Sequence, residues 1–228
     1  MSASNSIVWE KILRKGAEAN LYEGYWFGKK VIFKHRIKKD YRENILDSII
    51  RAKRTINEGR ALIKVKEEGI NVPQVYELDT ENALIIMKYI EGQKLKDLMP
   101  KLANSEKIPL FYNVGKQIAT LHINGHIHGD ITTSNIIITE EKQVFLIDFG
   151  LHEYSDSIED KSVDLHLFKR VLISTHGKDF KPCFNAFLEG YQSEYKLLEN
   201  DDSKLIIKNI SAIERRGRYV KRDEKEFG

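Results

Sequence analysis

Apolar and polar residues alternate along the first 35 residues, which is the pattern of β-strands with one buried face. Glycines interrupt the pattern, so the segment predicts three short strands joined by turns at Gly16, Gly24 and Gly28. A helical spacing follows from about Tyr41 to Glu68, and Gly69 is expected to end that helix. The apolar residues that repeat at this spacing are Ile45, Ile49, Ala52, Ile56 and Ile63.

Two further apolar runs, VPQVYEL and ALIIMKYI, predict two more strands and complete a first unit of about five strands and one helix. The pattern changes at Glu91 and Gly92, so we expect one unit over residues 1–91 and a second over residues 92–228. The second unit is predicted to be mainly helical, with the short strands NIIIT and VFLID in its first half. Its apolar helical stripes are Phe111, Val114, Ile118 and Leu121, ending near Gly125, and then Leu165, Phe168 and Leu172.

The composition is that of an ordinary globular protein, with 41% hydrophobic and 31% charged residues in 228. A single cysteine, Cys183, excludes an internal disulfide and a zinc site built from several cysteines. The N-terminus lacks the apolar core of a signal peptide, and no apolar run approaches membrane-spanning length. We therefore expect a soluble, cytoplasmic protein.

The net charge of +3 is unevenly distributed. Residues 29–54 hold ten lysines and arginines against three acids, a local net charge of +7. A second basic segment, RRGRYVKR, lies near the C-terminus. Such clusters suit a partner that bears phosphates, although a solvated helix face and a loose tail explain them equally well.

The chemistry of the second unit centres on Asp130, Asn135 and Asp148. Asn135 follows Asp130 by five residues and can reach the same cleft across a tight loop. The two short strands between Asn135 and Asp148 fold the chain back, so we expect these side chains to lie together. Asn and Asp supply the oxygen ligands that suit Mg²⁺, which leaves Asp130 to orient or deprotonate a nucleophile. This division matches the phosphoryl-transfer template, in which the second Asp belongs to a D-F-G motif.

A lysine on an apolar strand adds to this pattern. Lys34 lies in VIFKHR and needs an anionic partner if the strand is buried. Glu58, in the helix that follows, is the expected partner in a Lys–Glu ion pair. The alternative is that Glu58 is an exposed acid paired with Arg54 or Arg51 on its own helix.

The nucleotide loop matches the kinase pattern poorly. Only Gly16 remains of a glycine-rich loop in KGAEANLYEG, and no P-loop replaces it. The residues expected at the phosphates are Gly16, Ala17, Glu18 and Ala19. In the run IIMKYIEG, the backbone of Lys88 and Ile90 is expected to contact adenine.

Together these segments resemble the PRPK family, the small atypical kinases of the KEOPS (EKC) complex. The shared segments are GAEA, the Lys34 strand, RTINEGRAL, HGDITTSN, IDFGL, EDKSVDL and the arginine-rich C-terminus. The resemblance implies an α+β, bilobal protein-kinase-like fold: a small β-rich N-lobe with one long helix, and a reduced, mainly helical C-lobe without an activation segment. It also implies an ATP- and Mg²⁺-dependent serine/threonine kinase or ATPase that works with a threonylcarbamoyl-transferase subunit and tRNA.

Carried over residue by residue, the resemblance assigns phosphate binding to Lys34 and acid–base catalysis to Asp130. Metal binding falls to Asn135 and Asp148. The chain departs from ordinary protein kinases at Gly129, which replaces the Arg of H-R-D, and it has no A-P-E motif. We therefore expect no switching by loop phosphorylation, and we expect Asp164 to brace the catalytic loop.

Three alternatives stay open at this stage. A small-molecule phosphotransferase of the aminoglycoside or choline type uses the same H-G-D-x-x-x-x-N, but this chain lacks the length after Leu151 for the usual helical insert. A RIO-type kinase acting on ribosomes is equally short. A pseudokinase scaffold would have lost Lys34, Asp130 or Asp148, all of which are present. The sequence leaves open whether the reaction is protein phosphorylation or coupled ATP hydrolysis.

Overall fold

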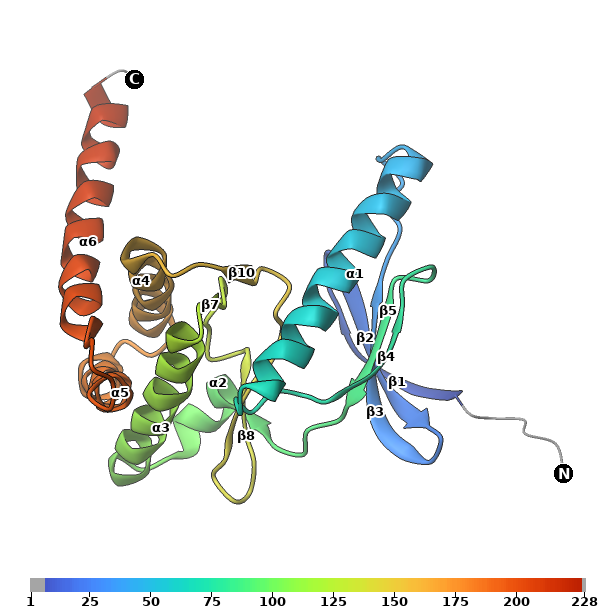
Figure 1. Ribbon diagram of the computed structural model, residues 1–228, viewed down its shortest axis with the longest axis horizontal. Helices are drawn as coiled ribbons and strands as arrows, with labels where there is room; N and C mark the ends of the chain where they lie inside the picture. The colour runs from blue at the N-terminus through green and yellow to red at the C-terminus, as the bar shows by residue number, and fades with distance from the viewer. Residues whose placement is uncertain (1–6, 227–228) are drawn as a thin grey trace, which may run out of the picture. The chain divides into compact units, whose positions relative to one another are not determined.

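A computed structural model describes residues 7–226, with side chains as far as residue 216. The chain forms two compact units (Figure 1). The first extends to Glu91 and also includes Asp148–Gly150, and the second comprises Gly92–Ile147 and the chain from Leu151 onward. The α+β fold class expected from the sequence is confirmed, with a β-sheet in the first unit and helices dominating the second.

The first unit is built on one antiparallel five-stranded sheet with the strand order β1-β2-β3-β5-β4. The strands are β1 (Ile7–Lys15), β2 (Ala19–Trp26), β3 (Lys29–Arg36), β4 (Val75–Asp79) and β5 (Leu84–Lys88). Val31 and Phe33 of β3 are fully buried on one face, together with residues of β5. Because side chains alternate along a strand, Lys34 and Arg36 lie on the opposite face.

The turn predicted at Gly24 is wrong. Gly24 lies inside β2, and a Cβ atom there would come within 2.0 Å of the Val8 carbonyl oxygen on β1. The glycine therefore permits a close approach of two strands rather than a change of direction. The turn predicted at Gly28 is present, and Phe27 and Gly28 both have positive φ, as the type I′ hairpin loop requires.

The single helix of the first unit is α1 (Asn44–Glu67), which packs against β4 and β5 (Figure 1). The Glu43 side chain accepts hydrogen bonds from the first backbone amides of the helix, and Gly69, at φ +82°, ends it. The predicted span was thus about three residues too long at its N-terminus. Ile45 and Ile49 are exposed, whereas the C-terminal half of the helix contributes Leu62 and other buried residues to the core.

The second unit is organised around four helices: α3 (Asn104–Ile123), α4 (Ile158–Thr175), α5 (Phe180–Tyr195) and α6 (Ser203–Glu226). Helices α3 and α5 pack closely through small residues. A Cβ atom at Gly115 would lie 2.0 Å from the Phe187 carbonyl oxygen, and one at Gly190 would lie 1.9 Å from that of Tyr112. Helix α3 begins well before the predicted apolar stripe.

Short elements frame the segment that carries Asp130 and Asn135. The strands β6 (Gln93–Lys94), β8 (Ile136–Ile138) and β9 (Val144–Leu146) form one small sheet, while β7 (His126–Ile127) pairs with β10 (Glu153–Tyr154). A short helix α2 (Leu95–Leu98) and a 3₁₀ turn η1 (Met99–Lys101) complete the unit. Residues 128–135 therefore form a loop held at both ends by strand pairing. Only residues 151–157 separate Gly150 from α4, which confirms the expected absence of a long activation segment in this described part of the chain.

The C-terminal basic segment differs from the expected loose tail, because the backbone of α6 is helical to Glu226. Of its five cations, Arg215 and Arg216 lie within the described side chains, and Arg216 pairs with Glu159 of α4 at 2.8 Å. The other three, Arg218, Lys221 and Arg222, lie outside them. Among residues 7–226, no helix combines the length and apolar character needed to cross a membrane.

Candidate active site

Lys34 is the centre of a buried ionic cluster in the first unit. Its Nζ atom lies 2.5 Å from Oε1 of Glu58 and 2.7 Å from Oδ1 of Asp148. Lys34 is 7% exposed and Glu58 is 1% exposed, so both charged groups are shielded from solvent. Burial alone lowers the pKa of Lys34, but the Glu58 and Asp148 carboxylates outweigh it and hold the pKa above its usual value. The lysine is therefore a fixed positive charge.

The predicted Lys34–Glu58 ion pair is present, and the alternative reading of Glu58 as an exposed helix acid is wrong. The arginines that the alternative invoked have other partners: Arg54 binds Glu18, and Arg51 binds Asp47 on its own helix. The second carboxylate oxygen of Glu58 accepts a hydrogen bond from Nη2 of Arg36, at 2.6 Å.

Asp148 has an unusual backbone. Its φ angle is +66°, in the left-handed region that few residues other than glycine, asparagine and aspartate adopt readily. The next residue, Phe149, is 1% exposed and anchors the segment, while the Asp148 side chain keeps 39% of its surface exposed. The carboxylate is thus accessible to a ligand while Lys34 orients it.

The loop of residues 128–135 holds the other two predicted site residues together. The Nδ2 atom of Asn135 donates to Oδ2 of Asp130 at 2.9 Å and to the Asp130 carbonyl oxygen at 3.0 Å. Because the amide nitrogen is committed to Asp130, the Asn135 side-chain oxygen is the atom left to bind a cation. The Ile147 amide donates to the Asn135 carbonyl oxygen at 2.9 Å, so strand pairing returns the chain beside Asn135 just before Asp148. The meeting of the Asn135 and Asp148 side chains stays a prediction.

Asp164 of α4 braces this loop, as the sequence predicted. Its carboxylate accepts hydrogen bonds from the backbone amides of His128 at 2.9 Å and Gly129 at 3.1 Å. It also contacts the buried imidazole of His122 at 3.2 Å. Burial lowers the pKa of His122, and this effect outweighs the opposing effect of the Asp164 carboxylate. The lowered pKa favours a neutral imidazole.

The structure explains Gly129. Its φ angle is +77°, and a Cβ atom there would lie 2.3 Å from the Leu151 carbonyl oxygen. An arginine at this position, as in H-R-D, would be strained and would collide with the backbone. The glycine is therefore required by the path of the loop itself.

We expect Asp164→Ala to lower the free energy of unfolding by about 3 kcal/mol, because a buried amide, a partly buried amide and a buried imidazole lose their acceptor. Turnover of the substrate should fall as well, since the loop carrying Asp130 loses its anchor. Urea unfolding of the variant measures the first effect, with the exposed Asp160→Ala on the same helix as the control. Equal stability of the two variants would show that Asp164 is not a brace.

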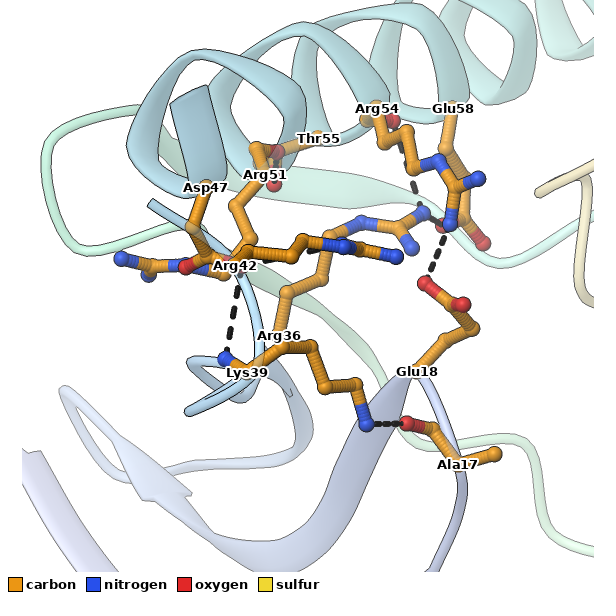
Figure 2. A network of polar contacts seen from close by, with 10 residues as sticks. All are labelled: Ala17, Glu18, Arg36, Lys39, Arg42, Asp47, Arg51, Arg54, Thr55 and Glu58. Atoms are coloured by element: carbon orange, nitrogen blue, oxygen red, sulfur yellow. Dashed lines mark hydrogen bonds and ion pairs between the residues drawn. The ribbon is translucent and has the colours of Figure 1, made fainter. Parts of the chain in front are cut away.

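The predicted nucleotide loop is tied to α1 and to the segment after β3 (Figure 2). Glu18 forms an ion pair with Arg54, and the Ala17 carbonyl oxygen accepts a hydrogen bond from Nζ of Lys39. The Gly16 amide donates to the Ala19 carbonyl oxygen at 3.0 Å, so it closes the turn and is not directed at a ligand. Side-chain tethers from other elements thus hold this loop where a protein kinase has a glycine-rich one.

The expected adenine contacts are only partly compatible with the structure. The Lys88 amide donates to the Gln74 carbonyl oxygen at 2.8 Å and is therefore engaged within the sheet region. The Lys88 N–H is therefore not the group that contacts adenine, and a contact through the rest of the Lys88 backbone stays a prediction. The role of Ile90, which is 8% exposed, stays a prediction.

A cavity of about 560 Å³ opens beside Asp130 within the second unit. Its wall combines Asp130 and Thr132 of the loop with residues of α4, including Arg170 and Ser174. The cavity supplies space next to the predicted acid–base residue for a group that bears a hydroxyl.

The sequence reasoning missed the roles of Arg36 and Arg54. Arg36 stands two residues after Lys34, so the strand period already placed both on one face. That signal was available, but a second cation has no place in the kinase template. Arg54 gave no such signal, because its partner Glu18 is far away in the sequence.

Comparison with known proteins gives the class first. The RIO domain family matches residues 28–157, which is more than half of the chain, so the fold and the Lys34 cluster belong to a RIO-type, kinase-like protein. A KEOPS complex subunit Bud32 from Pyrococcus abyssi is 47% identical over 218 residues, covering 93% of this chain and 97% of the relative. This chain belongs to the Bud32 family.

Other relatives are longer. A probable bifunctional tRNA threonylcarbamoyladenosine biosynthesis protein from Methanocaldococcus jannaschii is 40% identical over 92% of this chain and 37% of its own length. A protein of the same description from Methanothermobacter thermautotrophicus is 41% identical over 92% of this chain and 36% of its own length. The chain therefore spans little more than a third of these bifunctional relatives.

Proposed function

We propose that this protein is an ATP- and Mg²⁺-dependent atypical kinase or ATPase that acts as a KEOPS subunit and supports threonylcarbamoyladenosine modification of tRNA. The observation that carries the catalytic half is the buried Lys34, held by Glu58 and Asp148 as a phosphoryl-transfer site requires. The biological half rests on the names of the relatives, one a KEOPS subunit and the others tRNA threonylcarbamoyladenosine biosynthesis proteins.

Within this proposal, Lys34 binds ATP phosphates and Glu58 fixes its position. Asp130 orients or deprotonates the attacking hydroxyl or water, and Asn135 and Asp148 hold the metal. The donor chemistry fits Mg²⁺, because an amide oxygen and a carboxylate are hard ligands, and Mg²⁺ usually takes its remaining ligands from phosphates and water. Bound Mg²⁺ would supply charge neutralisation for the transferred phosphoryl group.

Two acceptors of the phosphoryl group fit the proposed site. The cavity beside Asp130 supports a hydroxyl acceptor such as a serine or threonine side chain. Water in the same place would make the protein an ATPase coupled to its partner's cycle. Both reactions use the same residues, and the tests below separate them.

The proposed partners are a threonylcarbamoyl-transferase subunit, other KEOPS subunits and tRNA within the assembled complex. The relatives' names disfavour a ribosomal kinase and a small-molecule phosphotransferase. The intact Lys34 cluster disfavours a pseudokinase scaffold. The cytoplasmic location stays a prediction of the sequence.

The direct test is ATP turnover by the purified chain, alone, with the transferase subunit, and with that subunit and tRNA. Radiolabelled ATP distinguishes phosphate released to water from phosphate transferred to protein. We expect Mg²⁺-dependent turnover that rises when the partner and tRNA are added. A chain that neither hydrolyses ATP nor transfers its phosphate under any of these conditions would overturn the proposal.

The C-terminal basic segment is expected to serve the assembled complex rather than the fold of this chain. The apolar residues Ile206 and Ile210 of α6 are 0% and 3% exposed, and both precede the basic segment. Beyond them, described side chains make pairs with partly exposed partners: Glu214 with Lys169 at 2.7 Å, and Arg216 with Glu159 at 2.8 Å. Such pairs contribute about 1 kcal/mol at most.

Truncation after Ile213 should therefore lower the melting temperature by only about 2–4 °C and leave intrinsic ATP binding unchanged. Activity of the reconstituted complex should fall sharply, and its tRNA binding should lose part of its salt dependence, because lysine and arginine contacts to phosphates release counterions. Titrations at several salt concentrations measure this slope. Full activity and an unchanged slope in the truncated complex would show that the segment is only a solvated helix end.

A further inference from the structure

Glu58 is held by two cations, whereas the kinase template needs one. Lys34 contacts Oε1 at 2.5 Å, and Arg36 contacts Oε2 at 2.6 Å through Nη2. Arg36 is 4% exposed, so it is as deeply buried as the lysine. Figure 2 shows its side chain reaching from β3 to the turn of α1 that carries Arg54 and Glu58.

Beyond Glu58, Arg36 has one further contact, and it adds little to the stability of the fold. Nη2 also approaches the Arg54 carbonyl oxygen at 3.5 Å, a weak hydrogen bond. Its Nε atom is buried and has no hydrogen-bond partner among the described residues. A buried donor left unsatisfied costs free energy, and buried ion pairs often stabilise a fold no better than apolar residues do. These surroundings of Arg36 therefore favour a functional role beside its structural one.

The charges of the cluster indicate what that role is. Lys34 and Arg36 bring two positive charges, and Glu58 and Asp148 bring two negative charges, so the four side chains are neutral together. Lys34 divides its hydrogen bonds between the two acids. If Arg36 were neutral, these four side chains would carry one uncompensated negative charge, and Lys34 would be the cation left beside Glu58.

We propose that Arg36 is a positioning residue for nucleotide binding, which holds Glu58 so that Lys34 can exchange its contact with Asp148 for the phosphates of ATP. The inference rests on the proposed ATP-binding function. Arg36 fixes the second oxygen of Glu58 by a bond that does not depend on Lys34. It also cancels the charge that would repel a triphosphate beside the cluster.

The test compares the affinities of Arg36→Gln for ATP with Mg²⁺ and for adenosine, measured by calorimetry on the whole chain. Affinity for ATP should fall about tenfold, the effect of one uncompensated charge several ångströms from the phosphates in a partly buried site. Affinity for adenosine should not change, because adenosine carries no phosphate. If Arg36 had only a structural role, the affinities for ATP and for adenosine would fall together. The ratio of the two affinities therefore decides between the two roles.

Four further variants test the proposal more closely. Arg36→Lys keeps the charge and should retain more ATP affinity than Arg36→Gln, and it replaces that variant if the latter does not fold. Glu58→Gln combined with Arg36→Gln should bind ATP no more weakly than Glu58→Gln alone, because Arg36 acts through Glu58. Arg60→Gln, an exposed arginine on α1, is the matched control and should match the unmodified protein.

The inference would be overturned if Arg36→Gln or Arg36→Lys lost affinity for ATP and for adenosine equally. It would also be overturned if neither variant lost affinity for ATP. Both outcomes would leave the proposed function in place. An additive effect in the double variant would likewise overturn the inference alone. An unmodified protein that binds neither ligand would instead overturn the proposed function, and the inference would fall with it.

Discussion

Asp148→Asn should remove Mg²⁺-dependent ATP turnover, lowering it by about a hundredfold or more, while the protein stays folded. The substitution deletes the carboxylate charge that we assign to metal binding and keeps the shape of the side chain. Asparagine also tolerates the φ angle of +66° observed here. Because Lys34 keeps Glu58 as a partner, no buried cation is left without an anion.

Alanine at the same position is a poorer test, because it adds about 1 kcal/mol of backbone strain in the left-handed region. Asp97→Asn, an exposed acid on α2, is the matched control. Circular dichroism and thermal melting show whether each variant is folded, and turnover is measured over a range of Mg²⁺ concentrations. A folded Asp148→Asn protein with near-normal turnover would remove Asp148 from the metal site.

The elements that the sequence predicted best are those in which local pattern and tertiary packing agree. The strand β5 is an apolar run and β3 contains one, and both pack into the sheet core, while α1 is followed by Gly69, whose φ of +82° ends the helix. Gly24 was misread because a glycine in a strand and a glycine in a turn look the same in sequence. What distinguishes them is the approach of Val8 on β1, which is a tertiary contact.

The candidate site was predictable to the same extent. A lysine on a buried strand needs an anion, which identified Glu58 once the next helix was located. The contact of Asp130 with Asn135 followed from a five-residue loop. By contrast, the tether between Glu18 and Arg54 joins residues far apart in the chain, and nothing in the local pattern specifies such a pair.

The second large effect concerns Lys34 and Glu58. The Lys34 variant should lose more activity, whereas the Glu58 variant should lose more stability. Lys34→Met should abolish most ATP turnover, because the phosphates lose their cation. It should lower the stability of the fold less than Glu58→Ala does, since Arg36 still neutralises Glu58 and Asp148 is partly exposed. Methionine also fills much of the space of the lysine stem.

Glu58→Ala should instead destabilise the fold by about 3–5 kcal/mol, the cost of leaving buried charges without their partner. Arg36 loses its only ion pair among the described residues, and Lys34 keeps only Asp148. Turnover should fall less than in Lys34→Met, because the lysine remains near the phosphates. Glu67→Ala is the matched control, an acid on the same helix with 64% of its side chain exposed, and it should be nearly neutral.

Urea unfolding and steady-state kinetics of the three variants separate the two effects. The expected order of stability is Glu67→Ala above Lys34→Met above Glu58→Ala, and the expected order of turnover places Lys34→Met last. A Glu58→Ala protein as stable as the control would contradict the buried pairing of Glu58 with both cations. A Lys34→Met protein with normal turnover would show that phosphate binding lies elsewhere, because the cation that pairs with both Glu58 and Asp148 would then be dispensable.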